Sequence, residues 1–170
     1  MRNNIFTILV MTCALSSSGA TTSSAGQAAR PVFAHQSFIL HTTGHIVVPV
    51  IVNGTTTNMV VDTGAGVTVV DDSSVATLGL QLENREQSPD RSEATGAGGA
   101  NLPTKNSAGN TISFGGFTEQ NVTIMTMDLS HVVVALSETG IDVSGVIGAD
   151  FLSRHKAVID YSKRQITLEL

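Results

Sequence analysis

Short apolar runs alternate with clusters of Gly, Asn, Asp and Ser along most of the chain. Runs of this length that are rich in Val, Ile and Thr and bounded by turn residues are typical of β-strands. The strongest run, 45–52, is followed by Asn53-Gly54, a pair that favours a tight hairpin, and the return strand is expected at 57–61. Pro49 indicates an edge or a bulge within the first of these strands. The pattern therefore predicts an all-β domain in which many short strands form a closed, barrel-like lobe.

Two short helices are expected among the strands. The first is predicted at 71–78, because Asp71-Asp72-Ser73-Ser74 offers N-cap side chains and Gly79 is a typical stop. The second is predicted at 149–155. The remaining strands are predicted at 38–40, 67–70, 111–114, 117–125, 132–136, 145–148, 156–161 and 165–169.

The N-terminus has the pattern of a secretion signal. Arg2 precedes the apolar run 5–15, which is too short to span a membrane as a helix, and Ser18-Gly19-Ala20 offers small residues for cleavage. We therefore expect a signal peptide at 1–20 and export of the protein to a periplasm or to the outside of the cell. A buried N-terminal strand or helix is the alternative interpretation, and a lipid anchor at Cys13 is a further one.

The Ser-, Thr- and Ala-rich sequence after the signal predicts a flexible leader at 21–35 and one domain at 36–170. No later run of eighteen or more apolar residues follows, so no transmembrane segment is expected in the mature chain. Cys13 is the only cysteine and lies within the signal. Neither a disulfide framework nor thiol catalysis is therefore expected.

Charge and composition restrict the partners and the core. The chain has 14 acidic and 9 basic residues and a formal net charge of −5, which argues against binding to nucleic acid. Only 4% of its residues are aromatic, although 41% are hydrophobic. The core must therefore be built mainly from Val, Ile, Leu and Ala.

One acidic residue stands at the end of an apolar strand. The run 59–61 leads directly into Asp62, which is followed by Thr63 and Gly64. A carboxylate in such a place is costly to bury and calls for a partner or a function. The simpler interpretation is a strand that ends in a turn.

Two further segments extend this motif. Ala94 to Ala100 consists almost entirely of small residues, and glycines there permit the close approach of a ligand backbone or make a flexible surface loop. Some eighty-five residues after Asp62 comes the sequence Gly145-Val146-Ile147-Gly148-Ala149-Asp150-Phe151-Leu152.

With these segments in this order, the chain resembles the single-lobe, retropepsin-like aspartic proteases, in particular the exported bacterial aspartyl proteases. The resemblance extends over 38–170 and rests on Val60-Val61-Asp62-Thr63-Gly64-Ala65, on 145–152 and on the closing strands 157–168. It implies an acid-protease single lobe that hydrolyses peptide bonds. It also implies roles for the following residues: Asp62 as the catalytic carboxylate; Thr63, Gly64 and Ala65 in support of its loop; Val146, Ile147 and Gly148 as the partner strand; and Gly96, Ala97, Gly98 and Gly99 as a flap over the substrate.

Peptide hydrolysis of this kind needs a base for the attacking water and an acid for the leaving groups, and two adjacent carboxylates supply both. The chain contains one Asp-Thr-Gly, and Glu138-Thr139-Gly140 mimics it only superficially. The sequence therefore predicts a homodimer with one Asp62 from each copy, a protein or peptide substrate, and neither a metal nor a cofactor. The alternatives are a catalytically silent peptide-binding or assembly module with the same fold and an all-β envelope domain.

Other polar residues are assigned to structural or surface positions. Asp150 is expected to cap the helix at 149–155 or to face solvent. His41 and His45 are four residues apart, but they flank Gly44 in a β-rich segment, so a metal site is not expected. His131 and His155 have no acidic partner nearby in the sequence, and surface roles are predicted for both.

Overall fold

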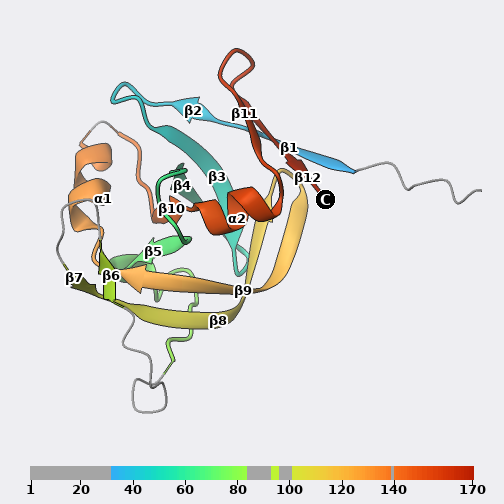
Figure 1. Ribbon diagram of the computed structural model, residues 1–170. Helices are drawn as coiled ribbons and strands as arrows, with labels where there is room; N and C mark the ends of the chain where they lie inside the picture. Colours follow the sequence, from blue (N-terminus) through green and yellow to red (C-terminus); the bar gives the residue numbers. More distant parts are fainter. Residues whose placement is uncertain (1–31, 84–92, 96–100, 139) are drawn as a thin grey trace, which may run out of the picture. The chain divides into compact units, whose positions relative to one another are not determined.

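Six strands close into a barrel in the computed structural model, which describes residues 32–83, 93–95, 101–138 and 140–170, with the backbone alone at 93–95, 101 and 102. The ring closes because β8 pairs back with β3 through Ile51 and Ser113 and through Val52 and Ile112. The predicted all-β, barrel-like lobe is confirmed (Figure 1). In order of pairing the barrel strands are β3 (Ile46–Val52), β4 (Thr55–Val61), β10 (Gly145–Ile147), β5 (Val69–Asp71), β9 (Phe117–Met127) and β8 (Lys105–Phe114).

Other strands lie outside the ring. The short strand β2 (Ile39–Leu40) pairs with β3, and β6 (Glu93–Thr95) pairs with β7 (Asn101–Pro103). A separate sheet contains β1 (Phe33–Ser37), β12 (Gln165–Glu169) and β11 (Val158–Asp160) in this order.

Strand β1 begins earlier than the sequence indicated. The first strand was expected at Phe38 and a flexible leader up to residue 35, whereas β1 begins at Phe33. Each of its residues pairs with a residue of β12, from Phe33 with Glu169 to Ser37 with Gln165. This partner lies at the other end of the chain, so the apolar pattern around Phe33 alone does not indicate the strand.

The hairpin of β3 and β4 has the predicted turn, since Asn53 and Gly54 both have positive φ, 48° and 83°. Pro49 pairs with Asn58 of β4 on one side. On the other side of β3, the pairing with β2 ends at Val47 and the pairing with β8 starts at Ile51. Pro49 therefore lies in the unpaired gap between these two strands. A residue without an N–H group fits such a gap without loss of a ladder hydrogen bond.

Two apolar clusters hold the domain together. The larger fills the barrel and includes Phe114 and Phe151, whose ring centroids lie 5.7 Å apart. Phe151 belongs to α2 (Ala149–Arg154), the second predicted helix, which is confirmed. The smaller cluster joins barrel strands to α1 (Ser130–Ser137) and is made of Val47, Val60, Val69, Met127, Leu129, Leu136, Val143 and Val146.

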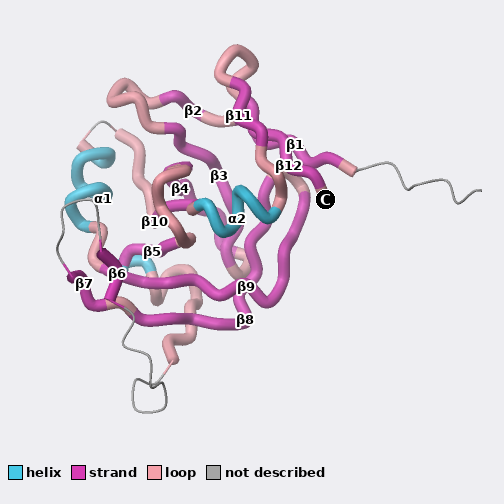
Figure 2. The backbone as a smooth tube through the Cα atoms, viewed as in Figure 1, coloured by secondary structure: helices cyan, strands magenta, loops and turns pink. Residues whose placement is uncertain are grey.

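Helix α1 corrects a prediction, because 132–136 was expected to be a buried strand (Figure 2). Its β-branched residues favour a strand by propensity, but their burial follows a helix. Leu136 belongs to the smaller cluster and Val132 and Val133 pack against it, whereas Val134 is 53% exposed. The side chain of Asp128 accepts a hydrogen bond from the Ser130 N–H at 2.9 Å and so supports the first turn.

The helix expected at 71–78 is shorter than predicted. Asp71 does cap it, accepting a hydrogen bond from the Ser73 N–H at 3.0 Å, and Gly79 has the expected positive φ of 65°. The regular part is a single 3₁₀ turn, Asp72–Ser74, followed by further turns. The other carboxylate oxygen of Asp71 accepts from the Leu129 N–H at 2.7 Å, so this buried acid also fixes the segment before α1.

The described residues belong to one compact unit. None of the helices within the described ranges has the length and apolar character that would let it cross a membrane. The predicted signal peptide, including Cys13, and most of the expected leader lie outside the described residues.

Candidate active site

Asp62 is the first residue after β4, whose last three residues are buried, and its own side chain is exposed. Its N–H donates to the carbonyl oxygen of Ile147 at 3.1 Å, so the backbone keeps the strand direction for one further residue. Its carboxylate oxygen Oδ1 accepts a hydrogen bond from the Gly64 N–H at 2.8 Å.

Gly64 has a steric reason to be glycine. A Cβ at this position would lie 3.2 Å from Oδ1 of Asp62, which is closer than most Cβ contacts. The loop is closed on its other side by the Ala65 N–H, which donates to the Asp62 carbonyl oxygen at 3.2 Å. The turn therefore presents an exposed carboxylate on a backbone that is bonded on both sides.

Strand β10 lies directly beside this loop. It runs parallel to β4, with Val146 opposite Val60 and Ile147 opposite Val61. Just after it, the Ala149 N–H donates to the Ala65 carbonyl oxygen at 2.7 Å. Gly148 permits this close approach, because a Cβ there would collide with the backbone of Val67.

A hydroxyl that the sequence did not single out connects the loop to α2. Thr68 is 1% exposed, and its Oγ1 accepts from the Gly148 N–H at 3.2 Å and donates to Oδ1 of Asp150 at 2.8 Å. Asp150 was expected to cap the helix or to face solvent, and it instead bonds the loop. The pattern of residues around Thr68 carries no signal of this contact, because its partners lie some 80 residues away.

The remaining predicted site residues are only partly described. Thr63 is exposed beside Asp62, and Ala65 is half-buried against the smaller apolar cluster. The predicted flap, Gly96 to Gly99, lies outside the described residues. The hairpin that follows it in the sequence, β8 and β9, is present and longer than expected.

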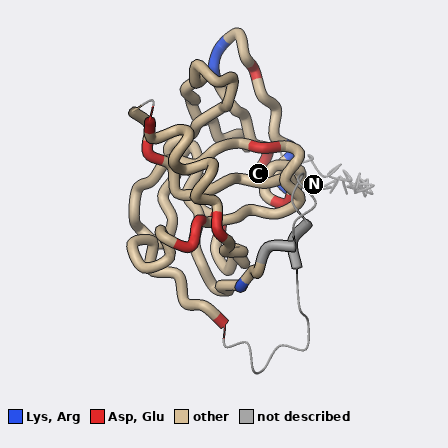
Figure 3. The backbone as a smooth tube through the Cα atoms, turned by 90° about the vertical axis from the view of Figure 1, so that its left-hand side faces the viewer, with Lys and Arg blue, Asp and Glu red and all other residues tan. Residues whose placement is uncertain are grey.

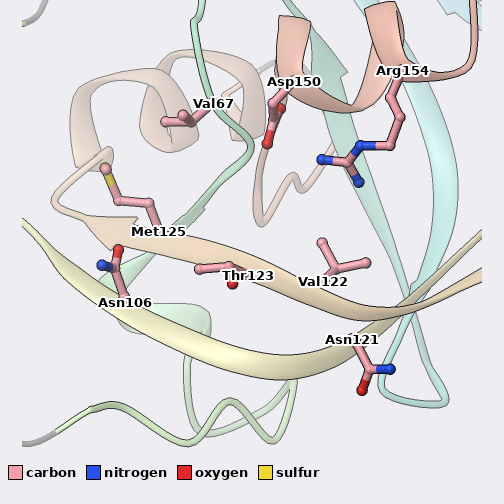
Figure 4. A pocket seen from close by; sticks show the side chains of 8 residues that line it. All are labelled: Val67, Asn106, Asn121, Val122, Thr123, Met125, Asp150 and Arg154. Carbon is pink, nitrogen blue, oxygen red and sulfur yellow. The ribbon is translucent and has the colours of Figure 1, made fainter.

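A pocket of about 430 Å³ borders the loop at Val67. Figure 4 shows the side chains of Asp150 and Arg154 extending from α2 toward β9, which carries Thr123 and Met125. The lining of the pocket mixes apolar side chains with both signs of charge and with amide and hydroxyl groups. The residues that line it are Val67, Asn106, Asn121, Val122, Thr123, Met125, Asp150 and Arg154.

His155 corrects another prediction, because a surface role was expected for it. The residue is 8% exposed, and its Nε2 lies 2.9 Å from Oε2 of Glu119 on β9. Arg154 bonds the other oxygen of the same carboxylate. Burial alone would raise the pKa of Glu119, but the hydrogen bonds and charges of His155 and Arg154 outweigh it and hold this pKa below its ordinary value. Glu119 lies 36 residues away from His155, so a search for nearby acids in the sequence misses the pair.

No group of three or more His, Cys, Asp or Glu side chains within the described ranges is arranged to hold a metal ion. His41 and His45 both bond Thr43, at 2.6 and 2.7 Å. Acidic and basic residues are dispersed along the tube, with the acidic ones in excess (Figure 3).

The fold is similar to that of three solved structures at low sequence identity. The first is a retropepsin-like aspartic protease from Rickettsia conorii (18% identity, TM-score 0.53, covering 82% of this chain and 93% of that one). The second is the EIAV protease in complex with the inhibitor HBY-793 (20% identity, TM-score 0.51, covering 72% of this chain and 98% of that one). The third is the retroviral protease-like domain of Ddi1 from Leishmania major (16% identity, TM-score 0.52, covering 73% of this chain and 87% of that one).

Sequence comparison gives a consistent result. No curated protein matches the chain, but a family model described as "Aspartyl protease" matches residues 48–151, more than half of its length. The match includes both the Asp62 loop and β10. The chain therefore belongs to the aspartyl protease family and has the retropepsin-like single-lobe fold.

Proposed function

We propose that the protein is an aspartic endopeptidase that acts as a homodimer, with one Asp62 from each copy in the active site. The observation that carries the proposal is the exposed Asp62 carboxylate, held by the Gly64 N–H on a loop that β10 and Thr68 support. Membership of the aspartyl protease family supports the same conclusion.

The requirement for two copies follows from the chemistry. A base must take a proton from water while an acid gives a proton to the substrate, and one carboxylate cannot do both at once. The chain contains a single Asp-Thr-Gly. A two-fold axis that places two Asp62 loops face to face would supply the second carboxylate from an identical site.

In the proposed reaction the two carboxylates share one proton, because like charges this close do not both ionise. The ionised one takes a proton from water as the water oxygen bonds to the peptide carbonyl carbon, and the other gives its proton to the carbonyl oxygen. The resulting diol then loses a hydroxyl proton to the carboxylate that is now ionised, the C–N bond breaks, and the other carboxyl group gives the nitrogen the proton that it took from water. The products are a carboxylic acid and an amine.

The other loop residues would assist this chemistry. The Gly64 N–H holds the Asp62 carboxylate in one orientation, and we propose that the exposed Thr63 hydroxyl bonds the loop of the partner copy. Residues 96–99 would cover the substrate and exclude water. We also propose that residues 1–20 direct the protein out of the cytoplasm, which N-terminal sequencing of the protein recovered outside it would test.

The purified protein should cleave a mixed peptide library at acidic pH and be inhibited by a statine-type inhibitor. Asp62→Asn should remove this activity with little effect on stability, because the residue is exposed. Glu138→Gln is the matched control, since Glu138 is an exposed acid in the superficially similar Glu138-Thr139-Gly140, and it should stay active.

Mixing wild-type and variant subunits tests whether two copies share one active site. Equal amounts of wild type and Asp62→Asn should lower the wild-type activity to about half after subunit exchange, because half of the active chains then have an inactive partner. Cleavage by Asp62→Asn would contradict the proposal. A strict monomer that binds peptides without cleaving them would favour the silent binding module instead.

A further inference from the structure

The pocket beside the Asp62 loop is a concave site that the proposed chemistry does not use. Its volume of about 430 Å³ lies in the range of pockets that hold small ligands. Helix α2 contributes Asp150 and Arg154 to it, β8 and β9 contribute polar and apolar side chains, and Val67 connects it to the loop (Figure 4). The charges and hydrogen-bonding groups of these elements determine what the pocket can hold.

The two charged side chains of the pocket have different partners. Arg154 forms an ion pair with Glu119, so its positive charge is already compensated. Asp150 is half-buried, and its Oδ1 accepts a hydrogen bond from the neutral hydroxyl of Thr68 at 2.8 Å. Among the described residues, no cation pairs with Asp150 and no donor bonds its other oxygen, Oδ2. The pocket therefore presents a carboxylate without a cationic partner.

The neutral groups of the lining suit a cation with an apolar stem. The amides of Asn106 and Asn121 and the hydroxyl of Thr123 line the same pocket, and their oxygens can accept from an ammonium or guanidinium group. Val122 and Met125 offer apolar surface for the methylene groups that precede such a head group. The excess of 14 acidic over 9 basic residues in the whole chain also attracts cations.

Strand β9 adds main-chain groups to this site. Within the described residues its pairing with β5 begins at Met125, whose N–H donates to the Thr68 carbonyl oxygen at 3.2 Å. Main-chain groups of alternate residues point to the same side of a strand, so the N–H and carbonyl group of Thr123 face this side before the pairing with β5 begins. An unpaired strand edge binds extended peptides through main-chain hydrogen bonds. A peptide residue with a basic side chain therefore matches both the edge and the carboxylate.

We propose that this pocket is an accessory peptide-binding site that takes a lysine or arginine side chain from an extended peptide segment. The ammonium or guanidinium group bonds Oδ2 of Asp150, the alkyl stem packs on Met125, and the peptide main chain bonds the edge of β9 at Thr123. Arg154 keeps its bond to Glu119 and so holds α2 against β9.

The position of the pocket gives the proposal a consequence for substrate choice. The pocket borders the Asp62 loop at Val67, so a peptide seated in it can continue toward the proposed active site. Substrates with a basic residue at some distance from the cleaved bond should then be preferred. This kinetic part rests on the proposed peptidase function, whereas the binding part does not.

The simpler interpretation is that Asp150 only holds Thr68 and that the pocket contains water. Asp150→Asn separates the two interpretations, because the amide oxygen can still accept from Thr68 while the charge is lost. Asp142→Asn is the matched control, since it removes the same charge from an exposed residue between α1 and β10. The carbonyl oxygen of Asp142, which accepts from the Asn58 side chain, is unchanged by the substitution.

The test is an NMR titration of the full-length protein with a capped tripeptide that has lysine between two alanines. A second tripeptide has norleucine in place of lysine, which keeps the stem and lacks the charge. The lysine peptide should shift the amide signals of Thr123 and of α2 and bind about two- to fivefold more tightly, as expected for a partly exposed ion pair. This preference should disappear in Asp150→Asn, persist in Asp142→Asn and weaken at high salt.

The kinetic part is tested with pairs of substrates that have lysine or norleucine at successive positions outside the cleaved bond. At one or more of these positions the kcat/KM of the wild type should be about two- to fivefold higher for lysine, chiefly through a lower KM. The ratio should be close to one in Asp150→Asn. It should stay at the wild-type value in Asp142→Asn.

The outcomes separate the accessory site from the proposed function. Equal binding of the two tripeptides by the wild type, or shifts confined to residues 62–66, would overturn the accessory site without the need for a variant, and any peptide cleavage would still stand. An equal loss of preference in Asp150→Asn and Asp142→Asn would also overturn it, because the attraction would then come from the net charge. Lysine-dependent shifts at Thr123 in a protein that cleaves nothing would support the accessory site and remove the peptidase.

Discussion

Thr68 donates its hydroxyl hydrogen to Oδ1 of Asp150 at 2.8 Å and accepts the Gly148 N–H at 3.2 Å, so one buried side chain joins the Asp62 loop, the end of β10 and α2. Thr68→Val keeps the shape of the side chain but leaves the Asp150 carboxylate and the Gly148 N–H without their Thr68 partner. We expect a loss of about 1–3 kcal/mol in the free energy of unfolding, measured with urea. Thr123→Val, on an exposed position of β9, is the control and should change stability little. Equal effects of the two substitutions would mean that the Thr68 bonds do not stabilise the fold.

Gly148 should tolerate no side chain. Its φ of −94° is allowed for any residue, so the cost of Gly148→Ala is steric: the new Cβ would collide with the backbone of Val67. We expect a loss of at least about 2 kcal/mol in stability, or failure to fold. Gly66→Ala, in the Asp62 loop that Gly148 packs against, is the matched control, because a Cβ there meets nothing within 4 Å, and it should be close to neutral. A stable Gly148→Ala protein would show that the loop and β10 separate easily.

Local sequence patterns were sufficient for the parts of the fold that local chemistry determines. The Asn53-Gly54 turn depends on two adjacent residues, and Asp62 at the end of β4 follows from an apolar run that stops at an acid. Helix α1 was missed because β-branched residues dominate 132–136. Only the contacts in the folded domain show the helix, since Leu136 reaches the same apolar cluster as Val133 and Val132, three and four residues before it.

Contacts between distant residues were not predictable in the same way. Thr68 and Asp150, or Glu119 and His155, are each ordinary polar residues in their own segments. Their pairing depends on how β5, β9 and α2 pack in three dimensions. The sequence therefore located the candidate carboxylate but not the hydrogen bonds that hold its loop.

Stability should depend on the ionisation of Glu119. Because His155 and Arg154 hold the pKa of Glu119 below its ordinary value of 4.5, its ionised form stabilises the fold fully above that value, and the contribution is lost as the pH falls through the lower folded pKa. Glu119→Gln should therefore cost about 1–2 kcal/mol near pH 6 and much less near pH 3, measured by urea unfolding. Glu169→Gln, which breaks the more exposed pair with Lys156, should cost little at either pH. A cost for Glu119→Gln that does not change with pH would show that the charge has no part in the effect.

Thr126 is 0% exposed on β9, and its hydroxyl oxygen is the buried side-chain polar atom that has no hydrogen-bond partner in the part of the chain that the structure describes. A buried hydroxyl without a partner costs free energy, because it has lost its bonds to water. Thr126→Val removes this cost and keeps the shape, so we expect the free energy of unfolding to stay equal or rise by about 1 kcal/mol.

Thr126→Ser is the matched control for this position. It keeps the unpaired hydroxyl and removes the methyl group, so it should lower stability by roughly 1 kcal/mol through lost apolar burial. If Thr126→Val is instead the less stable of the two, the hydroxyl must have a partner, and a water enclosed between β9 and its neighbours β5 and β8 would be the first to test, since buried waters bond polar groups that the protein leaves unpaired. Both variants are compared by their free energies of unfolding. The sign of the difference between these two values decides whether the hydroxyl at this position stabilises or destabilises the barrel.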